Sequence, residues 1–531
     1  MHPWVSVVIP VHNSLPYLED TLASVFHQSV DRERVEVIAV DDGSTDDSPR
    51  TLAAWAARWP QLQVITQAAS GTAGRPRNVG IERATGDYLF FLDSDDCLGP
   101  EALERLLGFA REHDSDVVLA KLVGIGRSVP RTVFQEDLPR AGLRSGVYYT
   151  LMPFKLVRRS LVMDHDIRFP EHMRISEDQR FVAACYLAAD VISVLGSYPA
   201  YYLMRREDGS NLSKDGLPYA DVVRQADETV RMVVEQTSPG ADQAHLVGRH
   251  IRIELLHRIQ HVLLDLPPEE QAELVRTAAP YARAWRVEGL DTELTVSERL
   301  ICAALGREDL DRVVRLVRWW VHGQRSPAVH DGGRWFLAAP GFRESDAYPD
   351  ELFTMKEPPD AATATWQVGL EGRTLSISGH GYIKGIPSAD CEIAVTLIQV
   401  DSDREVELDV DRTPTPFLNA VEGGGPVSYA EAGFRARGDL DAESLGSGRW
   451  RLVVRITAPH LTQHRNLLPP AGFEPTKSSW ESDDGTRRTA VLRVGSKDNL
   501  VVGLKSTQAA TVIPGTPPRR WIPRRPGRSG P

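Results

Sequence analysis

Three carboxylates gather directly after an apolar run of the sequence. In the stretch FFLDSDD they are Asp93, Asp95 and Asp96. Carboxylates held this close repel one another unless a cation neutralises their charge. The hard ions Mg²⁺ and Mn²⁺ prefer oxygen ligands, and they commonly bind through one or two carboxylates together with the phosphates of a substrate. Because a diphosphate leaving group needs the same neutralisation while its bond breaks, the cluster predicts a site for a metal ion and a diphosphate.

Two earlier apolar runs also end in polar groups. VSVVIPV ends at Pro10 and Val11, with Asn13 just beyond, and VEVIAVDDGS carries Asp41 and Asp42 at its end. In a parallel α/β sheet, ligands bind outside the carboxyl ends of the strands. An Asp-rich turn is weak evidence on its own, since Asp often caps a helix. Successive strand ends that carry such groups in this order favour a nucleotide-binding site.

The sequence pattern divides the chain into three main regions, and the first of them contains the elements that would position these groups. Residues 1–217 alternate short apolar runs with segments of helical period, which predicts an α/β domain with a largely parallel, Rossmann-like sheet. Residues 218–330 follow a helical period, and a connection over 331–360 contains Gly and Pro. Residues 361–507 contain short strands separated by turn signals, which is typical of a β-sandwich. The pattern leaves open whether there is one sandwich or two.

The composition narrows the classes of function. The formal net charge of −12 over 531 residues argues against general nucleic-acid binding. The four cysteines form no CxxC pair, which argues against a zinc site or a disulfide framework. The start of the chain lacks a signal-peptide pattern, and no apolar run reaches the ~18 residues of a membrane span, so we expect a cytoplasmic protein. The tail, 508–531, is rich in Pro, Gly and Arg and is expected to be disordered; it either contacts anionic lipid at the inner face of the membrane or has no role.

The motifs, taken in order, resemble those of the family-2 glycosyltransferases with the GT-A fold. The resemblance rests on SVVIPVHN, VIAVDDGSTDDS, GRPRNVG and YLFFLDSDD, and it covers the N-terminal domain. It implies a nucleotide-sugar donor and a Mn²⁺ or Mg²⁺ ion bound by Asp95 and Asp93, with Asp93 also touching the donor ribose or sugar. It further implies that Asp42 holds the uracil or ribose and that Arg77 lies near the nucleotide. The other donor contacts that it implies are Pro10 and Val11, through their backbone, together with Asn13, Ser94 and Arg127.

A second acidic pair, Glu177 and Asp178, lies in the stretch RISEDQRF. The pair resembles the ED[QR] element of inverting members of the family. Inversion requires a base near the anomeric carbon, opposite the leaving diphosphate, to take a proton from the acceptor hydroxyl. Asp178 is the candidate, with Glu177 next. On spacing alone, an acidic pair in the first turn of a helix is the more common explanation, and the upstream motifs reverse that preference.

The stretch YYLMRREDGSNLS resembles a segment that closes over the donor diphosphate in this family. Arg206 would then stabilise the leaving charge, and Ser213 would hydrogen-bond a phosphate, on a loop that acts as a lid. An ordinary solvated loop is the alternative explanation.

Three stretches together resemble a narrower group, the bacterial transferases that decorate wall teichoic acid. They are SDVVLAKLVGIGRSVPRTVF, FKLVRRSLVMDHDIRFPE and the lid stretch. Those enzymes place N-acetylglucosamine on poly(ribitol phosphate), and one branch carries a helical linker and a C-terminal immunoglobulin-like domain that forms trimers. The resemblance therefore implies UDP-GlcNAc as the donor, a β-linked product, an anionic polyol-phosphate acceptor and a homotrimer.

The helical stretch GRHIRIELLHRIQH would suit such an acceptor. Arg249 and Arg252 are three apart, and His257 and His261 are four apart, so each pair can share a helix face. A basic strip of this kind would bind phosphates. A solvated face paired with Glu254 explains the pattern equally well. The candidate acceptor-binding residues are Arg249, His250, Arg252, His257 and Arg258.

The sequence as a whole predicts an inverting, metal-dependent glycosyltransferase that moves a sugar from a UDP-sugar to a cell-wall polymer of the teichoic-acid kind. The main alternative is an enzyme of the same class that acts on another acceptor, such as a lipid-linked glycan, a peptide or a secondary metabolite. A noncatalytic glycan-binding protein is the third interpretation, and the carboxylates suited to a metal and a base argue against it.

Overall fold

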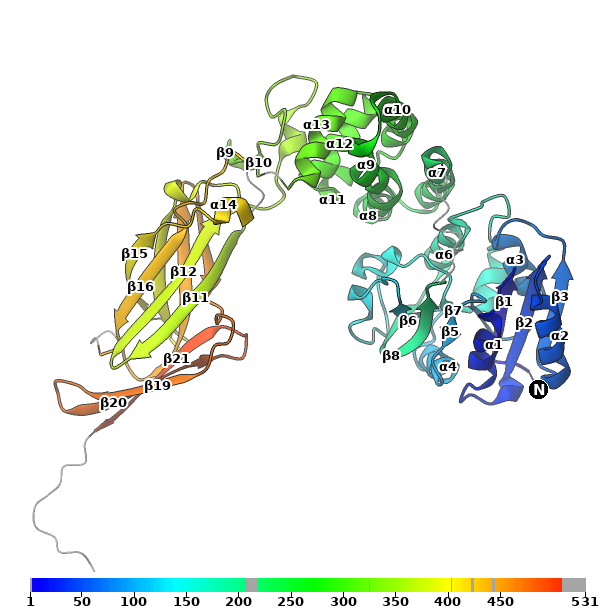
Figure 1. Ribbon diagram of the computed structural model, residues 1–531, viewed down its shortest axis with the longest axis horizontal. Helices are drawn as coiled ribbons and strands as arrows, with labels where there is room; N and C mark the ends of the chain where they lie inside the picture. The colour runs from blue at the N-terminus through cyan, green and yellow to red at the C-terminus, as the bar shows by residue number, and fades with distance from the viewer. Residues whose placement is uncertain are drawn as a thin grey trace, which may run out of the picture. The chain divides into compact units, whose positions relative to one another are not determined.

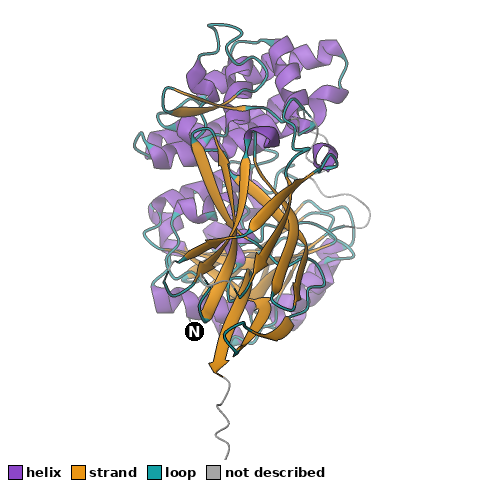
Figure 2. Ribbon diagram, turned by 90° about the vertical axis from the view of Figure 1, so that its left-hand side faces the viewer, coloured by secondary structure: helices purple, strands orange, loops and turns teal. Residues whose placement is uncertain are grey.

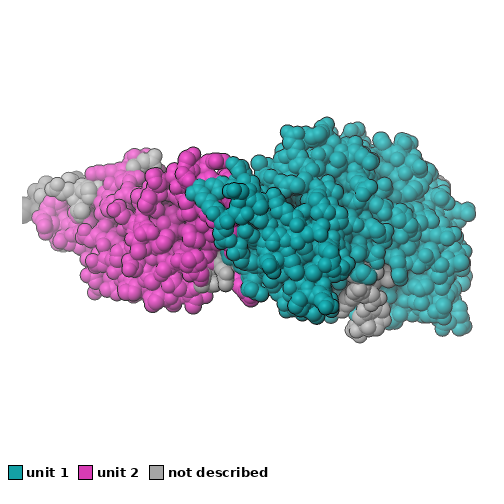
Figure 3. Space-filling model, turned by 90° about the horizontal axis from the view of Figure 1, so that it is seen from above, with its two compact units in different colours: residues 1–321, 343–352 teal, residues 322–342, 353–531 magenta. Residues whose placement is uncertain are grey.

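The computed structural model describes residues 2–206, 218–323, 325–402, 404–421, 425–441 and 445–508. The chain divides into two compact units, residues 1–321 with 343–352 and residues 322–342 with 353–531 (Figure 3). The predicted order, an α/β region followed by helices and then by β-sheets, is confirmed. The α/β region and the helices both belong to the first unit.

Among its described residues, the α/β region contains a mixed sheet of eight strands in the order β3-β2-β1-β4-β7-β6-β8-β5 (Figure 1). β3, β2, β1 and β4 pair in parallel, as do β6 and β8, so the largely parallel sheet that we expected holds for this first half. β7 and β5 pair antiparallel with their neighbours. β7 follows β6 without an α-helical crossover, which permits the antiparallel pairing. The strands are β1 Val5–Val11, β2 Val35–Asp42, β3 Leu62–Gln67, β4 Tyr88–Phe91, β5 Cys97–Leu98, β6 Val117–Ile125, β7 Lys155–Arg158 and β8 Ile192–Met204.

The helix α3 lies unusually close to β1, and this contact positions part of the site. A Cβ atom at Gly80 would lie only 2.2 Å from Val8 Cγ1, so a larger residue would push the helix away. Arg77, one turn earlier on the same helix, reaches the residues that follow β4. The helices of this region are α1 Leu18–Phe26, α2 Ser48–Arg58, α3 Gly74–Arg83, α4 Ala102–His113, α5 Arg159–Asp164 and α6 Glu177–Ala188.

The helical region packs around buried residues such as Trp285 and Leu305. A π-helical turn, Ile251–Leu256, joins α8 to α9, and its wider winding brings residues five apart into contact. None of the described helices combines the length and the apolar character that crossing a membrane requires. The helices are α7 Tyr219–Gln236, α8 Ala241–His250, α9 His257–Val262, α10 Pro268–Ala284, α11 Leu290–Glu293, α12 Val296–Gly306 and α13 Leu310–Val321.

In its described residues, the second unit contains two large antiparallel sheets (Figure 2) and the small two-stranded sheet β10-β9. The orders of the two large sheets are β11-β12-β16-β15 and β14-β13-β17-β21-β20-β19, and β18 pairs with β17. One buried cluster draws Ile377 and Phe434 from the first sheet and Leu397, Leu452 and Val502 from the second. The β region is therefore one sandwich, which answers the question that the sequence left open. Its elements are β9 Ala328–Asp331, β10 Arg334–Leu337, β11 Ala361–Glu371, β12 Thr374–Ile383, β13 Glu392–Gln399, β14 Glu405–Glu407, β15 Asp409–Thr413, α14 Leu418–Val421, β16 Gly433–Asp439, β17 Gly448–Ala458, β18 Leu461–Asn466, β19 Thr476–Glu481, β20 Thr486–Val494 and β21 Leu500–Gln508. The tail that the sequence predicts to be disordered lies, from residue 509, outside the described residues.

Candidate active site

The three carboxylates that follow β4 lie together. Oxygen atoms of Asp93, Asp95 and Asp96 are all within 4.8 Å of one another. Burial and the neighbouring charge of Asp93 raise the pKa of Asp95, which shows the electrostatic cost of the cluster. Oxygen ligands at this spacing suit Mg²⁺ or Mn²⁺, so the residues fit the divalent ion that the sequence implies.

Asp96 ties the cluster to β8. Its buried carboxylate accepts hydrogen bonds from the Tyr201 hydroxyl at 2.8 Å and from the Met204 amide at 2.7 Å. Burial, together with the charges of Asp93 and Asp95, raises the pKa of Asp96 to about 8. Because both oxygens of Asp96 are engaged within the fold, Asp93 and Asp95 are the better candidates for metal ligands.

Arg77 connects the cluster to the second acidic motif. Its Nη2 donates to Asp93 Oδ1 at 2.8 Å, and its Nη1 donates to Glu177 Oε1 at 2.8 Å. Burial opposes its charge, but the two carboxylates hold the pKa of Arg77 above its ordinary value. We expected Arg77 only near the nucleotide, and the structure adds this bridge.

Asp178 lies in the first turn of α6. Its Oδ1 accepts a hydrogen bond from the Gln179 amide at 2.8 Å, and burial and the charge of Glu177 raise the pKa of Asp178 to about 7 while Arg77 opposes the shift. A carboxylate stabilised only by a helix N-terminus would have a lowered pKa. The raised pKa of Asp178 suits a group that accepts protons near neutral pH.

The ends of β1 and β2 lie side by side, as parallel strands require. Val11 pairs with Asp41, and Pro10 precedes it on β1. Asn13 adopts a left-handed backbone conformation with a φ of 47°. Its Oδ1 accepts a hydrogen bond from the Thr45 amide at 2.7 Å, so Asn13 holds the loop after β2.

Two of the residues expected to bind the donor already hold loops of the site. The Asp42 carboxylate accepts hydrogen bonds from Gln67 Nε2 at 2.6 Å and from the Ser70 hydroxyl at 2.7 Å. The hydroxyls of Ser94 and Ser14 lie 2.5 Å apart. Their roles toward a donor stay predictions.

Arg206 lies beside the carboxylate cluster. Its Nε donates to Asp95 Oδ2 at 2.6 Å, and its guanidinium is 5.8 Å from the centre of the Tyr17 ring. This location suits a residue that stabilises a leaving diphosphate. Ser213, its expected partner on the lid stretch, lies outside the described residues. Arg127 is exposed beyond the end of β6.

The five candidate acceptor residues do not share one solvated face. Arg249 and His250 are buried, with 6% and 0% of their surface exposed, and both contact the buried Glu254. Arg249 also donates to Gln179 Oε1 at 2.8 Å, and Arg252 donates to Glu298 at 3.0 Å.

The remaining two candidates lie after the π-helical turn. His257 is exposed, and its ring is 4.4 Å from that of His261, so these two histidines share a helix face. Arg258 is half-buried. The contact of any of these residues with an acceptor stays a prediction.

Lys155 is a buried polar residue that belongs to none of the sequence motifs of the site. Its ammonium group is buried and donates to the Met152 carbonyl at 2.5 Å. Burial lowers the pKa of Lys155 to about 7, and the charge of Asp178 opposes that shift. In the sequence, Lys155 is indicated only by being a lysine within the otherwise apolar run FKLV.

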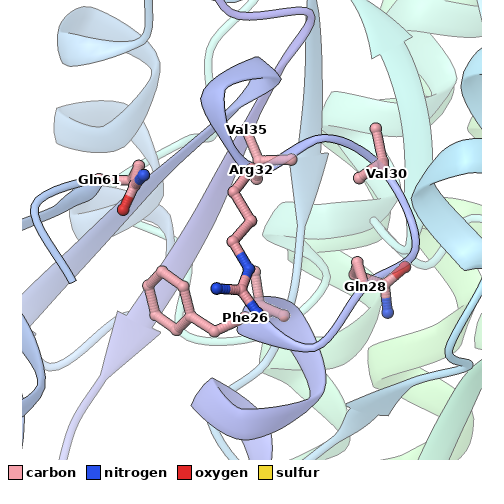
Figure 4. Close-up of a pocket in the computed structure, with 7 residues that line it drawn as sticks. Phe26, Gln28, Val30, Arg32, Val35 and Gln61 are labelled. Carbon is pink, nitrogen blue, oxygen red and sulfur yellow. The ribbon is translucent and has the colours of Figure 1, made fainter. Parts of the chain in front are cut away.

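A small cavity between α1 and β2 does not belong to this site (Figure 4). Its lining includes Phe26, Val30 and Gln61, and its volume is about 10 Å³. That volume holds about one water molecule, so the cavity is too small for a nucleotide or a sugar.

Two regions of the chain match known protein families. Residues 6–168 match the family model Glycosyl transferase family 2, and residues 219–317 match that of the Glycosyl transferase TarS linker domain. The chain is 36% identical over 288 residues to the poly(ribitol-phosphate) beta-glucosyltransferase of Bacillus spizizenii, a match that covers 53% of this chain and 45% of that protein. It is 33% identical over 289 residues to the poly(ribitol-phosphate) beta-N-acetylglucosaminyltransferase TarS of Staphylococcus aureus, which covers 52% and 49%. The chain thus spans about half the length of the curated relatives that it matches.

Solved structures extend the likeness to most of the chain. S. aureus TarS matches with a TM-score of 0.68 and 21% identity over 96% of this chain and 86% of that chain, which shows the shared fold. S. aureus TarS 1–349 in complex with UDP-GlcNAc matches with a TM-score of 0.58 and 29% identity over 64% of this chain and 97% of that chain. The resemblance to family-2 glycosyltransferases and to the teichoic-acid enzymes, which the sequence motifs indicate, is confirmed.

Proposed function

We propose that this chain, in which residues 6–168 form a family-2 glycosyltransferase domain, transfers a sugar from a UDP-sugar to a polyol-phosphate polymer of the teichoic-acid kind, with inversion and with a divalent metal ion. One observation carries the proposal. Arg77 joins Asp93 to Glu177 through two bonds of 2.8 Å, so the donor-side carboxylates and the acidic pair belong to one site. Mere binding of a glycan would need neither group, which disfavours the noncatalytic alternative.

The residues have separate roles in the proposed reaction. A metal ion bound by Asp93 and Asp95 would neutralise the donor diphosphate as its bond to the sugar breaks. Arg206, 2.6 Å from Asp95, would add positive charge beside the leaving group. The Asp178 carboxylate would take the proton of the acceptor hydroxyl as that oxygen attacks the anomeric carbon. Attack on the face opposite the diphosphate converts an α-linked donor into a β-linked product.

The relatives support the choice of donor and acceptor. A structure of S. aureus TarS contains UDP-GlcNAc, so we propose UDP-GlcNAc as the donor. UDP-glucose is the second candidate, because a relative of 36% identity is named a beta-glucosyltransferase. Both named relatives act on poly(ribitol phosphate), which makes that polymer the proposed acceptor ahead of a lipid-linked glycan, a peptide or a secondary metabolite.

Release of UDP tests this assignment. The purified full chain would be incubated with Mn²⁺, each of the two donors and either poly(ribitol phosphate) or an unrelated glycan. Polymer-dependent release with UDP-GlcNAc is the expected result. Faster release with UDP-glucose would change the donor, release with another acceptor only would change the acceptor, and no release with any acceptor would overturn the enzymatic proposal.

We also propose that the second unit assembles the chain into a homotrimer. Trp366, Phe417 and Val421 are exposed by 42%, 49% and 73%, and the first two rings lie 5.8 Å apart. Exposed apolar groups of this kind favour contact with another protein surface. A cytoplasmic location, with the basic tail at the inner face of the membrane, completes the proposal; residues 509–531 of that tail lie outside the described part of the chain.

A further inference from the structure

Among its contacts with the α/β region, the helical region makes three polar contacts with the short segment formed by residues 172–179. Two of the contacts come from α7 and one comes from α8. In each contact, a polar side chain of a helix binds either a side chain or a backbone amide of the segment. They are His172 Nε2 to Glu228 Oε2 at 2.9 Å, the Ile175 amide to Gln225 Oε1 at 3.2 Å, and Arg249 Nη1 to Gln179 Oε1 at 2.8 Å.

The segment that these contacts hold carries the candidate base in a strained backbone. Ser176 has a φ of 60° and a ψ of 10°, a left-handed conformation that few residues other than glycine adopt. Such a conformation persists only where the surroundings fix it. Gln179 provides part of that fixation, because its backbone amide donates to Asp178 Oδ1 at 2.8 Å and its side-chain Nε2 donates to Ser176 Oγ at 3.3 Å.

Arg249 is itself held firmly. Its Nη1 donates to the two oxygens of Glu254 at 2.7 and 2.9 Å, a contact between residues five apart that the π-helical turn makes. Glu254 Oε2 lies 3.0 Å from His250 Nδ1, and His250 Nε2 lies 3.0 Å from the Tyr148 hydroxyl. With its side chain 7% exposed and bound on both sides, Arg249 is built into the protein rather than offered to a ligand.

We propose that the helical region positions the candidate base. Gln225, Glu228 and Arg249 fix residues 172–179, and Arg249 acts on Asp178 through Gln179. Arg249 is therefore a positioning residue and not an acceptor contact. The inference rests on the proposed function only in naming Asp178 as the base. It gives the helices of the first unit a part in catalysis besides connecting the α/β region to the β-sandwich.

The test removes the contact without leaving a buried charge. Arg249→Met combined with Glu254→Gln removes both partners of the ion pair, because loss of one alone would leave the other uncompensated. The matched control is Arg299→Met, since Arg299 is an equally buried arginine of the helical region, 5% exposed against 6%, and donates to the Asp291 carbonyl. We expect kcat of the test variant to fall by about tenfold or more, since a small displacement of a reacting group costs that much. The KM for polymer and the Kd for UDP-GlcNAc should stay within about twofold of wild type, and the control should keep kcat per folded molecule.

A double-mutant comparison separates positioning from general damage. Gln179→Ala should lower kcat to a similar extent, and adding the Arg249→Met and Glu254→Gln changes should cause little further loss, because both act through one hydrogen bond. A raised KM for polymer with unchanged kcat would make Arg249 an acceptor contact and overturn the inference. Additive losses of kcat would also overturn it. If the Arg249 variant does not fold, Gln179→Ala alone decides, since it leaves the Arg249–Glu254 pair intact.

Crystal structures decide the inference even if the proposed acceptor is wrong. The 2.8 Å contact between the backbone amide of Gln179 and Asp178 Oδ1 should be lost in the variant that carries both Arg249→Met and Glu254→Gln. The same contact should be kept in Arg299→Met. Failure of wild type to use poly(ribitol phosphate) would remove the proposed function but leave this comparison valid. An unchanged Asp178 in the Arg249 variant would contradict the positioning role.

Discussion

Arg77 and Glu177 lie 100 residues apart in the sequence and 2.8 Å apart in the structure. The same guanidinium binds Asp93 at 2.8 Å, and only 5% of the Arg77 side chain is exposed. One buried cation thus joins the carboxylates that follow β4 to the acidic pair that opens α6. Loss of that cation should disturb both halves of the site at once.

Replacement of Arg77 tests this bridge through stability. Arg77→Ala leaves two carboxylates without their shared partner and should lower the free energy of unfolding by about 3–5 kcal/mol. Arg77→Lys keeps a charge but not the two-armed geometry, so its cost should be smaller but measurable. Arg75→Ala, at an exposed position of the same helix, is the control and should stay within about 0.5 kcal/mol of wild type. Denaturant unfolding measures all three, and equal values for Arg77→Ala and Arg75→Ala would contradict the bridge.

Asp95 is the residue through which to test the metal. Asp95→Asn removes one charge from the cluster, so UDP release with Mn²⁺ should be lost while the fold is retained, because repulsion with Asp93 is relieved. EDTA should abolish wild-type activity and added Mn²⁺ should restore it. Asp190→Asn, at an exposed carboxylate outside the cluster, should behave as wild type. Full activity of wild type in the chelator would exclude the metal-dependent reaction.

The pH dependence of catalysis follows from Asp178. Its pKa of about 7 means that the base is protonated, and inactive, in acidic solution. We therefore expect kcat to rise with pH through about 7 and to level off above it. The acidic limb should be absent from the residual activity of Asp178→Asn. A wild-type kcat that stays constant between about pH 5 and about pH 8 would assign the proton transfer to another group.

Asp178 also makes the free energy of unfolding depend on pH in a predictable direction. The pKa of Asp178 is about 7 in the folded chain and ~3.9 for an unfolded aspartate, so the folded state binds more protons between these values. The contribution of Asp178 to the free energy of unfolding therefore decreases as pH rises through this window. Asp178→Asn stays neutral and should raise Tm relative to wild type at about pH 8, with the difference vanishing near pH 4. A Tm difference that is the same at both pH values would contradict the assignment.

The exposed aromatic pair of the second unit tests assembly. We expect the full chain to scatter light as a trimer and Trp366→Lys to scatter as a monomer. The monomer should keep activity on a short acceptor and lose efficiency on a long polymer, because linked sites raise the effective concentration of repeating units. Val494→Lys, another exposed apolar position of the same unit, is the control. A monomeric wild-type chain would favour a glycan-binding role for the sandwich.

The sequence predicts local features of this fold better than its long-range contacts. The apolar runs, their helical or alternating period and the clustering of Asp93 with Asp95 are local, and the structure confirms each. The antiparallel pairing of β7 depends on which strands meet, and no local period encodes that.

The basic strip that the sequence predicts around Arg249 and Arg252 depends on the geometry of the helix that carries it. That strip assumed regular α-helical spacing, whereas the π-helical turn brings Arg249 to Glu254 and buries both. The partner of Arg249 across the site, Gln179, is 70 residues away, and such a contact can only be seen in the folded chain. Arg77 and Glu177 were each singled out from their motifs, but their contact was not predicted for the same reason.

The rate of transfer by wild type and by Asp178→Asn, with UDP-GlcNAc, Mn²⁺ and poly(ribitol phosphate), tests the central claim most directly. We predict that wild type forms β-linked N-acetylglucosamine on the polymer, detected by NMR of the anomeric signal. Asp178→Asn should bind UDP-GlcNAc as wild type does, and its kcat should be lower by roughly 10²–10⁴, the usual contribution of a general base. A wild type that leaves the polymer unmodified, or an Asp178→Asn variant with near-normal kcat, would contradict the account.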